Sequence, residues 1–233
     1  MTVEVCLSPL LYDKYHSKEN IVVVCDILRA TTSICTAFMN GAKDVIPTST
    51  VDEMRTYKDK GYLIAGERDG ITLDFANFGN SPFNFTKEQV NGRTIVYSTT
   101  NGTNAIFLGK EAKGVAIGSF LNLNAVASYL IKQQSNILIL CAAWKGKFCL
   151  EDTLFAGALV SLLQASCKIG SDSAYAALDL WGIAEHDPIA YIQKAAQRER
   201  LRKKKLDDVI DYSFTLNQTS IVPVLDEKHL IPV

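Results

Sequence analysis

The chain has 233 residues, of which 48% are hydrophobic and 21% charged, a composition typical of soluble globular proteins and not of disordered or fibrous ones. Lysine and arginine number 24 and aspartate and glutamate 25, so the formal net charge of -1 creates no overall field toward nucleic acid or an acidic membrane. The longest uncharged run, 114–131, is interrupted by polar residues and is shorter than the roughly 20 apolar residues of a membrane span. We therefore expect neither a membrane nor a nucleic-acid partner.

The first residues and the cysteines do not indicate export. Residues 1–11 lack both a basic start and a small-residue cleavage site, so we expect no signal peptide. The six cysteines form no C-x-x-C pair and most lie in apolar runs, as buried free thiols do in a reducing compartment. We expect a cytoplasmic protein with neither a disulfide framework nor a zinc knuckle.

Hydrophobic runs and helix caps predict the order β-α-β-α-β twice. In the first stretch we expect strands at 21–26, 45–47 and 62–65, and helices at 31–40 and 51–60. In the second stretch we expect strands at 94–97, 115–117 and 137–141, and helices at 103–110 and 122–133. Residues 41–45 resemble 111–115, which favours a duplicated half, although any α/β protein repeats strand and helix.

This order predicts an α/β fold with a largely parallel sheet covered by helices. Two pseudo-repeated β-α-β-α-β halves, at about 20–67 and 93–142, would form one compact three-layer unit. A helical C-terminal part follows at 151–233, and in it we expect helices at 152–167, 173–181 and 188–205 and a strand at 221–224. No linker divides the chain, so we treat 1–233 as a single domain, whose ligands should bind at the carboxyl ends of the strands.

Charged residues follow several of the predicted strands. Asp26 and Arg29 follow the first strand, and Glu67 and Arg68 follow the third. A further carboxylate pair, at 151–152, begins a helix beyond the strand 137–141. Such pairs also occur as plain surface salt bridges. Their recurrence at the strand ends favours a site, and carboxylates beside phosphate oxygens suit Mg2+, whereas zinc favours histidine or cysteine.

Two predicted helices start with hydroxyl and amide side chains, Thr31 with Thr32 and the run 98–103. Helix starts of this kind offer N–H and hydroxyl donors to an anion, and the second is a plausible phosphate cradle. A threonine-rich start is also typical of a plain helix cap, and the P-loop pattern is absent.

The scarcity of histidine excludes several mechanisms. His16, His186 and His229 are scattered, so a Ser-His-Asp hydrolase or a histidine phosphatase would lack its base. No cysteine has an arginine six residues later, which excludes the cysteine-dependent phosphatases. Carboxylate and metal chemistry with arginine clamps remains.

Five segments in order along the chain resemble the 2-phosphosulfolactate phosphatase family: VCDILRATT at 24–32, GER at 66–68, GNSP at 79–82, TTNGT at 99–103 and ED at 151–152. The resemblance extends to 222–224, so it covers essentially the whole chain. It implies a Mg2+-dependent phosphatase, on an α/β fold peculiar to the family, that hydrolyses 2-phospho-3-sulfolactate to 3-sulfolactate and phosphate. This is a step of coenzyme M biosynthesis.

The resemblance and the strand-end pattern together indicate the site residues. The expected catalytic residues are Asp26, Arg29, Glu67 and Arg68. The expected substrate-binding residues are Thr31, Thr32, Asn80, Ser81, Thr99, Thr100, Asn101, Gly102 and Thr103. We assign Mg2+ to Asp26 with Glu67 or with the pair Glu151 and Asp152. Asp26 could act as a nucleophile or could hold the metal whose water attacks, and both mechanisms stay open.

The chain departs from the family pattern in two places. Residues 75–78 read FANF where the family carries an acidic residue in a Gly-Phe-Asp context, and Ala142 and Ala143 stand where Ala-Gly is usual. These departures leave the fold prediction unchanged and bear on the identity of the substrate more than on the type of reaction. The alternatives are a phosphatase of another small phosphorylated carboxylic acid and a non-catalytic anion-binding protein. The expected partner is a small anionic phosphorylated substrate, and self-association into a homo-oligomer is compatible with the sequence.

The basic run 198–205 has six Arg or Lys residues among its eight. It contains no aromatic residue for base stacking, and Asp207, Asp208 and Asp211 follow it. We interpret it as the solvated face of a helix, with a nucleic-acid interface as the alternative. On this interpretation, neutralising the lysines at 203–205 should leave the activity unchanged.

Overall fold

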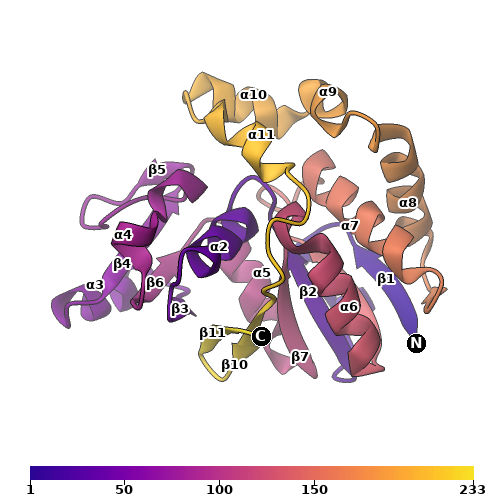
Figure 1. Cartoon of the computed structure of the whole chain (residues 1–233), viewed down its shortest axis with the longest axis horizontal. Helices are drawn as coiled ribbons and strands as arrows, with labels where there is room; N and C mark the ends of the chain where they lie inside the picture. Colours follow the sequence, from indigo (N-terminus) through magenta and orange to yellow (C-terminus); the bar gives the residue numbers. More distant parts are fainter.

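Eleven strands form one continuous sheet in the computed structural model, which describes residues 1–233 (Figure 1). The strands are β1 (Thr2–Cys6), β2 (Asn20–Cys25), β3 (Asp44–Pro47), β4 (Leu63–Arg68), β5 (Ile71–Thr72), β6 (Thr94–Ser98), β7 (Gly114–Gly118), β8 (Asn136–Cys141), β9 (Lys168–Ile169), β10 (Pro223–Asp226) and β11 (His229–Pro232). Their order across the sheet is β5-β4-β6-β3-β11-β10-β7-β2-β8-β1-β9.

Helices cover both faces of this sheet. The α-helices are α1 (Tyr12–Tyr15), α2 (Ala30–Met39), α3 (Val51–Asp59), α4 (Lys87–Val90), α5 (Gly102–Leu108), α6 (Leu123–Gln133), α7 (Leu150–Leu163), α8 (Asp172–Ala184), α9 (Pro188–Tyr191), α10 (Ala196–Lys203) and α11 (Ile210–Ser213). Short 3-10 helices lie at Pro9–Leu11, Pro82–Asn84, Gly109–Glu111, Phe120–Asn122, Ile192–Lys194 and Asp207–Val209. No helix is both long and apolar enough to cross a membrane.

The two predicted halves exchange their first strands. Strand β6 of the second half lies between β4 and β3 of the first half and is parallel to both. Strand β2 of the first half lies between β7 and β8 of the second half, again in parallel. The antiparallel hairpin of β10 and β11 joins the two groups, through single residue pairs to β7 and β3. Neither half forms a sheet of its own, and their origin as repeats stays a prediction.

The exchange makes two helices cross between the groups of strands. Helix α2 leads from β2 to β3, and α5 leads from β6 to β7. Their first turns meet, because a Cβ placed on Gly102 would lie 2.5 Å from the Cβ of Ala30. Only a glycine permits this approach, so Gly102 has a packing reason independent of ligand binding.

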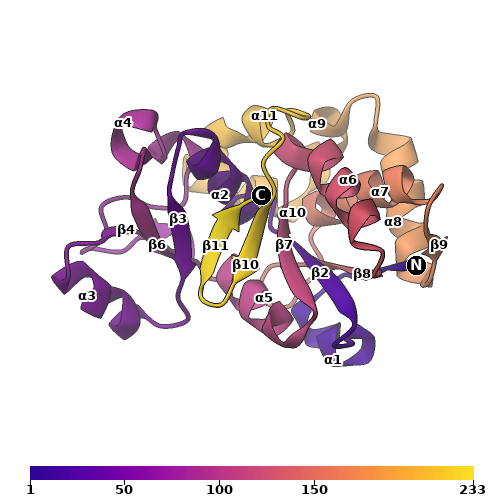
Figure 2. The same cartoon turned by 60° about the horizontal axis from the view of Figure 1, so that its bottom comes forward.

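Strand β2 is buried along its whole length and separates two hydrophobic cores. Ile21 and Val23 face the core under α6, α7 and α8, and Val22 and Val24 face the core under α1, α2 and α5. In Figure 2, α1 and α5 lie on the opposite side of β2 and β7 from α6, α7 and α8. A strand covered on both faces is a continuous apolar run, which is why this pattern was readable in the sequence. The predicted α/β fold, with its largely parallel sheet, is confirmed.

Some elements differ from the prediction. Strands β1 and β11 were not expected. Strand β1 has five residues with a glutamate at its centre, and β11 has four residues near the chain end. Segments this short show little hydrophobic periodicity. The helix expected at 188–205 is broken into α9, a 3-10 turn and α10, because Ala195 has an extended backbone. The six cysteines are free and buried, as expected.

The packing of α7 against α8 can be tested at two glycines. A Cβ on Gly157 would lie 2.0 Å from the carbonyl oxygen of Ala177, whereas a Cβ on Gly182 would meet nothing within 4 Å. We predict that Gly157→Ala lowers the free energy of unfolding by about 2–3 kcal/mol, because α8 must move away. Gly182→Ala, in the same helix pair, should raise it by up to about 1 kcal/mol. Denaturant unfolding measures both, and equal effects of the two substitutions would contradict the close approach.

Candidate active site

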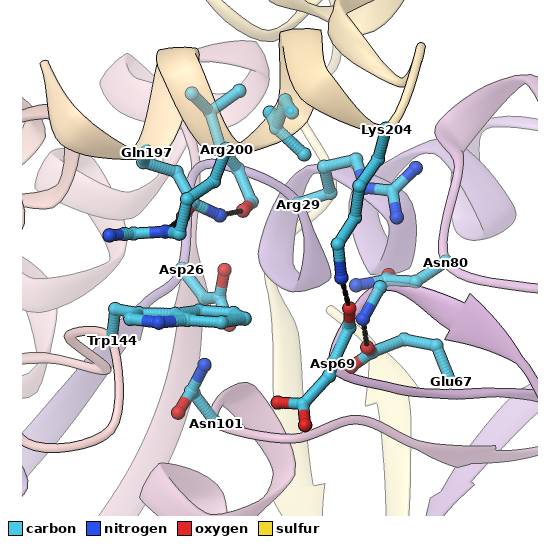
Figure 3. A pocket seen from close by; sticks show the side chains of 13 residues that line it. Asp26, Arg29, Glu67, Asp69, Asn80, Asn101, Trp144, Gln197, Arg200 and Lys204 are labelled. Atoms are coloured by element: carbon cyan, nitrogen blue, oxygen red, sulfur yellow. Dashed lines mark hydrogen bonds between the residues drawn. The ribbon is translucent and has the colours of Figure 1, made fainter.

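A pocket lies where the carboxyl ends of both groups of strands meet (Figure 3). Its walls come from the loops after β2, β6 and β8, from the end of β4, and from α10. Helix α10 lies across this end of the sheet in Figure 1, above the point where the two groups of strands converge. The site therefore combines segments from nearly the whole length of the chain.

Asp26 lines the pocket directly after β2, near Trp144 and Asn101 in Figure 3. Its backbone N–H donates to Oγ1 of Thr31 (3.0 Å), and its Oδ1 accepts the N–H of Ala30 (3.3 Å). Its Oδ2 accepts no hydrogen bond from the protein. Burial raises the pKa of Asp26 to about 6, and Glu67 adds to the rise, while the N–H of Ala30 and the charge of Arg29 oppose it. Asp26 is thus a carboxylate held in place at one oxygen and free at the other.

Arg29 is a buried cation without a partner in the protein. Its side chain is 5% exposed, lines the pocket, and makes no hydrogen bond or ion pair. Burial lowers the pKa of its guanidinium, which remains charged because arginine does not lose its proton in proteins. A buried charge without a partner is costly, and a planar guanidinium pairs best with a carboxylate or phosphate. Arg29 is therefore placed to receive an anionic ligand.

Glu67 lines the pocket, and its carboxylate is engaged by backbone groups. Its Oε1 accepts the N–H of Thr100 (2.7 Å), and its Oε2 accepts the hydroxyl of Thr100 (3.2 Å) and the N–H of Gly70. These bonds tie the end of β4 to the loop after β6. Glu67 therefore holds the two loops together and contributes negative charge near Asp26.

Arg68 does not line the pocket. Its guanidinium donates to the carbonyl of Glu67 (2.7 Å) and to Oγ of Ser98 (2.9 Å). These contacts connect the ends of β4 and β6 from behind the site. The structure thus gives Arg68 a supporting contact, whereas Arg29 faces the ligand space.

Most of the predicted substrate-binding residues bond within the protein instead of lining the pocket. Asn80 and Asn101 do line it. Two of the threonines donate to main-chain carbonyls at the start of their helices: Thr32 Oγ1 donates to the carbonyl of Ile27 (2.9 Å), and Thr103 Oγ1 donates to that of Thr99 (2.9 Å). The residues outside the lining are Thr31, Thr32, Ser81, Thr99, Thr100, Gly102 and Thr103.

Glu151 and Asp152 lie behind the pocket at the start of α7. Asp152 accepts the N–H of Ile27 (2.9 Å) and that of Ala143 (3.1 Å), so it ties the loop after β2 to the loop after β8. Glu151 is buried, and its Oε2 has no hydrogen-bond partner. Burial raises the pKa of Glu151 to about 7, and the charge of Asp26 adds to the rise. The structure contains no cluster of three or more His, Cys, Asp or Glu side chains that could hold a metal ion.

Comparison with known proteins decides the family. The family model described as 2-phosphosulpholactate phosphatase matches residues 6–228. A probable 2-phosphosulfolactate phosphatase of Thermotoga maritima is 40% identical over 203 residues, covering 87% of this chain and 88% of that protein. One of Caldanaerobacter subterraneus subsp. tengcongensis is 36% identical over 225 residues, covering 92% and 93%. The chain belongs to the 2-phosphosulfolactate phosphatase family.

The departures from the 2-phosphosulfolactate phosphatase pattern lie outside the pocket lining. Ala143 stands where the family usually has glycine, and its φ of 59° is in the left-handed region that glycine adopts most easily. Asn77, in the other departure, bonds to β4 through its N–H and its Oδ1. Both departures therefore concern the backbone behind the site more than the ligand space.

Sequence reasoning missed the contribution of α10. Gln197, Arg200, Leu201 and Lys204 line the pocket, so the basic run is not solvated on all sides, and neutralising Lys204 would change the pocket wall. The signal was Leu201, the one apolar residue of the run, which marks the buried face of the helix. Trp144 also lines the pocket, and nothing in its sequence context indicated that.

The raised pKa of Asp26 leads to a paired prediction. The pKa of Asp26 in the folded protein, about 6, exceeds the ordinary aspartate pKa of 3.8. The folded state therefore binds a proton at Asp26 more tightly than the unfolded state does. The stability that this proton provides is complete below about pH 4 and is lost as the pH rises through 6. In metal-free buffer at pH 8, Asp26→Asn should therefore raise the free energy of unfolding by about 1–3 kcal/mol, a gain that disappears at about pH 4. The same substitution should lower kcat/KM by about 1000-fold or more.

Thermal and denaturant unfolding at the two pH values, with a phosphate-release assay, measure both effects. The exposed Asp179→Asn in α8 is the control and should show neither. An active Asp26→Asn enzyme would contradict the catalytic role expected of this carboxylate. A variant with a lower free energy of unfolding at pH 8 would contradict the claim that burying the charge of Asp26 destabilises the fold.

Proposed function

We propose that this chain is a phosphoric monoester hydrolase that converts 2-phospho-3-sulfolactate and water to 3-sulfolactate and phosphate. This is the coenzyme M biosynthesis type of step that the family implies. The observation that carries the proposal is the guanidinium of Arg29, buried without a protein partner in the same pocket as Asp26. It provides the charge and the planar donors that a phosphate group requires.

One carboxylate oxygen of the pocket is a suitable donor for the proposed Mg2+. Mg2+ is commonly held by one or two carboxylates together with substrate phosphate and water, without a cage made of protein alone. Asp26 Oδ2 is a hard oxygen that accepts no hydrogen bond, on a carboxylate whose pKa is raised mainly by burial. We assign Mg2+ to Asp26. Bound there, it would neutralise charge on the phosphate and on the leaving oxygen.

The protein's own groups would position the ester. Arg29 would bind the phosphate through its terminal N–H groups and stabilise the charge that develops as the phosphorus–oxygen bond breaks. Asn80 and Asn101 flank this position in the pocket, and each amide oxygen already accepts a protein hydrogen bond, from Tyr97 and from the N–H of Lys145. The amide N–H groups are therefore left to donate to the substrate.

The substrate of the family is favoured over another phosphorylated carboxylic acid. The two departures of the sequence leave the pocket lining unchanged, and three cationic side chains, Arg29, Arg200 and Lys204, line a single pocket. Arg29 and Arg200 have terminal donors without a protein partner, so a ligand with a second anionic group suits this lining better than a simple phosphate monoester does.

A panel of phosphate esters tests the proposal. We predict that purified enzyme with Mg2+ releases phosphate from 2-phosphosulfolactate with kcat/KM at least about tenfold above that for 2-phospholactate and 2-phosphoglycerate. EDTA should abolish turnover, and added Mg2+ should restore it. Preference for another phosphorylated acid would assign a different substrate to the enzyme. Undiminished activity in EDTA would contradict the Mg2+ requirement. No phosphate release from any ester would favour a non-catalytic binding protein.

The two arginines of the motifs should behave differently. We predict that Arg29→Lys lowers kcat/KM by about 100-fold, because lysine keeps the charge and loses the planar fork. Arg68→Lys should lower it by less than about tenfold and should mainly lower the melting temperature, since Arg68 contacts protein groups behind the site. The exposed Arg202→Lys is the matched control. Equal losses for Arg29→Lys and Arg68→Lys would show that Arg68 also reaches the substrate.

A further inference from the structure

Helix α10 presents one side to the pocket. The lining residues Gln197, Arg200, Leu201 and Lys204 are spaced by three or four positions, so they lie on the same face of the helix. Gln197 fastens this face to the loop after β2, because its Nε2 donates to the carbonyl of Leu28 (2.9 Å). The side chains of α10 are thus held at a defined position above Asp26.

Arg200 is oriented from two sides. Its Nε donates to Oε1 of Gln197 (2.7 Å), and its guanidinium lies over the ring of Trp144, 4.7 Å from the ring centre. Its terminal nitrogens make no hydrogen bond and no ion pair. Arg200 therefore resembles Arg29 in being a positioned guanidinium whose outer donors have no protein partner.

Lys204, the other cation of this face, already has a partner. Its Nζ donates to the carbonyl of Asp69, whose carboxylate pairs with Lys145 (2.7 Å). These contacts close the rim of the pocket between α10, the end of β4 and the loop after β8. Of the two cations on this pocket-lining face, Arg200 is the one with free donors.

The two free guanidinium groups lie on different sides of Asp26. In Figure 3, Arg200 and Trp144 lie on one side of Asp26, and Arg29 lies on the other with Glu67 and Lys204. One phosphate beside Asp26 and Arg29 would leave Arg200 without a partner. A ligand that satisfies both must carry two separated anionic groups.

We propose that Arg200, held by Gln197 and Trp144, binds the second, non-reacting acid group of the substrate, so that α10 sets the preference for esters with an additional anion. This inference rests on the proposed function, in which Arg29 binds the phosphate. It makes Arg200 a specificity-determining residue that the family motifs do not include.

The two products of the proposed reaction, 3-sulfolactate and phosphate, distinguish the two anion positions, because only 3-sulfolactate carries the non-reacting acid group. The test measures the dissociation constants of 3-sulfolactate and of inorganic phosphate by calorimetry, in the same Mg2+ buffer, for the wild type and for Arg200→Gln. We expect 3-sulfolactate to bind about 30-fold more weakly to Arg200→Gln, because a charged donor is lost, and phosphate binding to change by less than about threefold. Arg200→Lys should lie between the wild type and Arg200→Gln.

The matched control is Arg202→Gln, which removes the same charge from an exposed position of α10. It should leave both dissociation constants unchanged. Circular dichroism melting of each variant establishes that the fold is intact, and Arg200→Lys provides a second variant with its charge retained.

Each result decides between the two proposals. Unchanged binding of 3-sulfolactate to Arg200→Gln, or an equal loss for phosphate, would overturn the role of Arg200 while leaving the hydrolase proposal standing. A wild-type protein that neither hydrolyses 2-phosphosulfolactate nor binds 3-sulfolactate would overturn the proposed function and this inference with it.

Discussion

The contact between the first turns of α2 and α5, at Ala30 and Gly102, is the constraint on which the site depends. It follows from the exchange of β2 and β6, since each crossover helix must then leave one group of strands and enter the other. The exchange brings the carboxyl ends of both groups to a single pocket. In an ordinary pair of separate β-α-β-α-β units, each unit would have its own sheet edge and its own ligand position.

Two kinds of carboxylate surround this contact. Glu67 and Asp152 accept backbone N–H groups and join loops that follow different strands. Asp26, between those loops, keeps one oxygen free. The carboxylates of Glu67 and Asp152 fix the backbone around that of Asp26, which is the arrangement that the proposed active site requires. The raised pKa of Asp26 is the cost of holding a free carboxylate in such a place.

Helix α10 completes the pocket from a part of the chain far from the strand ends. Its face bonds to the loop after β2 through Gln197, to Trp144 through Arg200, and to the end of β4 through Lys204. These contacts connect the C-terminal helices to both groups of strands. Binding of a ligand between Arg29 and Arg200 would therefore involve the sheet and the C-terminal part together.

The sequence alone determined the fold class and indicated two residues, Asp26 and Arg29, that line the pocket. Short β-branched apolar runs such as 21–25 favour buried strands, and the polar residues after them then lie at an edge of the sheet, which is how Asp26 and Arg29 were found. Periodicity is a local property, so it reports which face of an element is apolar and not which strand lies beside it.

Only the tertiary structure decided which strands pair and which polar side chains face the ligand. The exchange of β2 and β6 depends on contacts between residues far apart in the chain, which no local pattern records. The same holds for Asp152, which accepts two backbone N–H groups, and for Arg200, which was expected on a solvated helix face and lines the pocket. A charged side chain has the same sequence signature whether water, backbone or a ligand satisfies it, and its partner is set by the packing of distant elements.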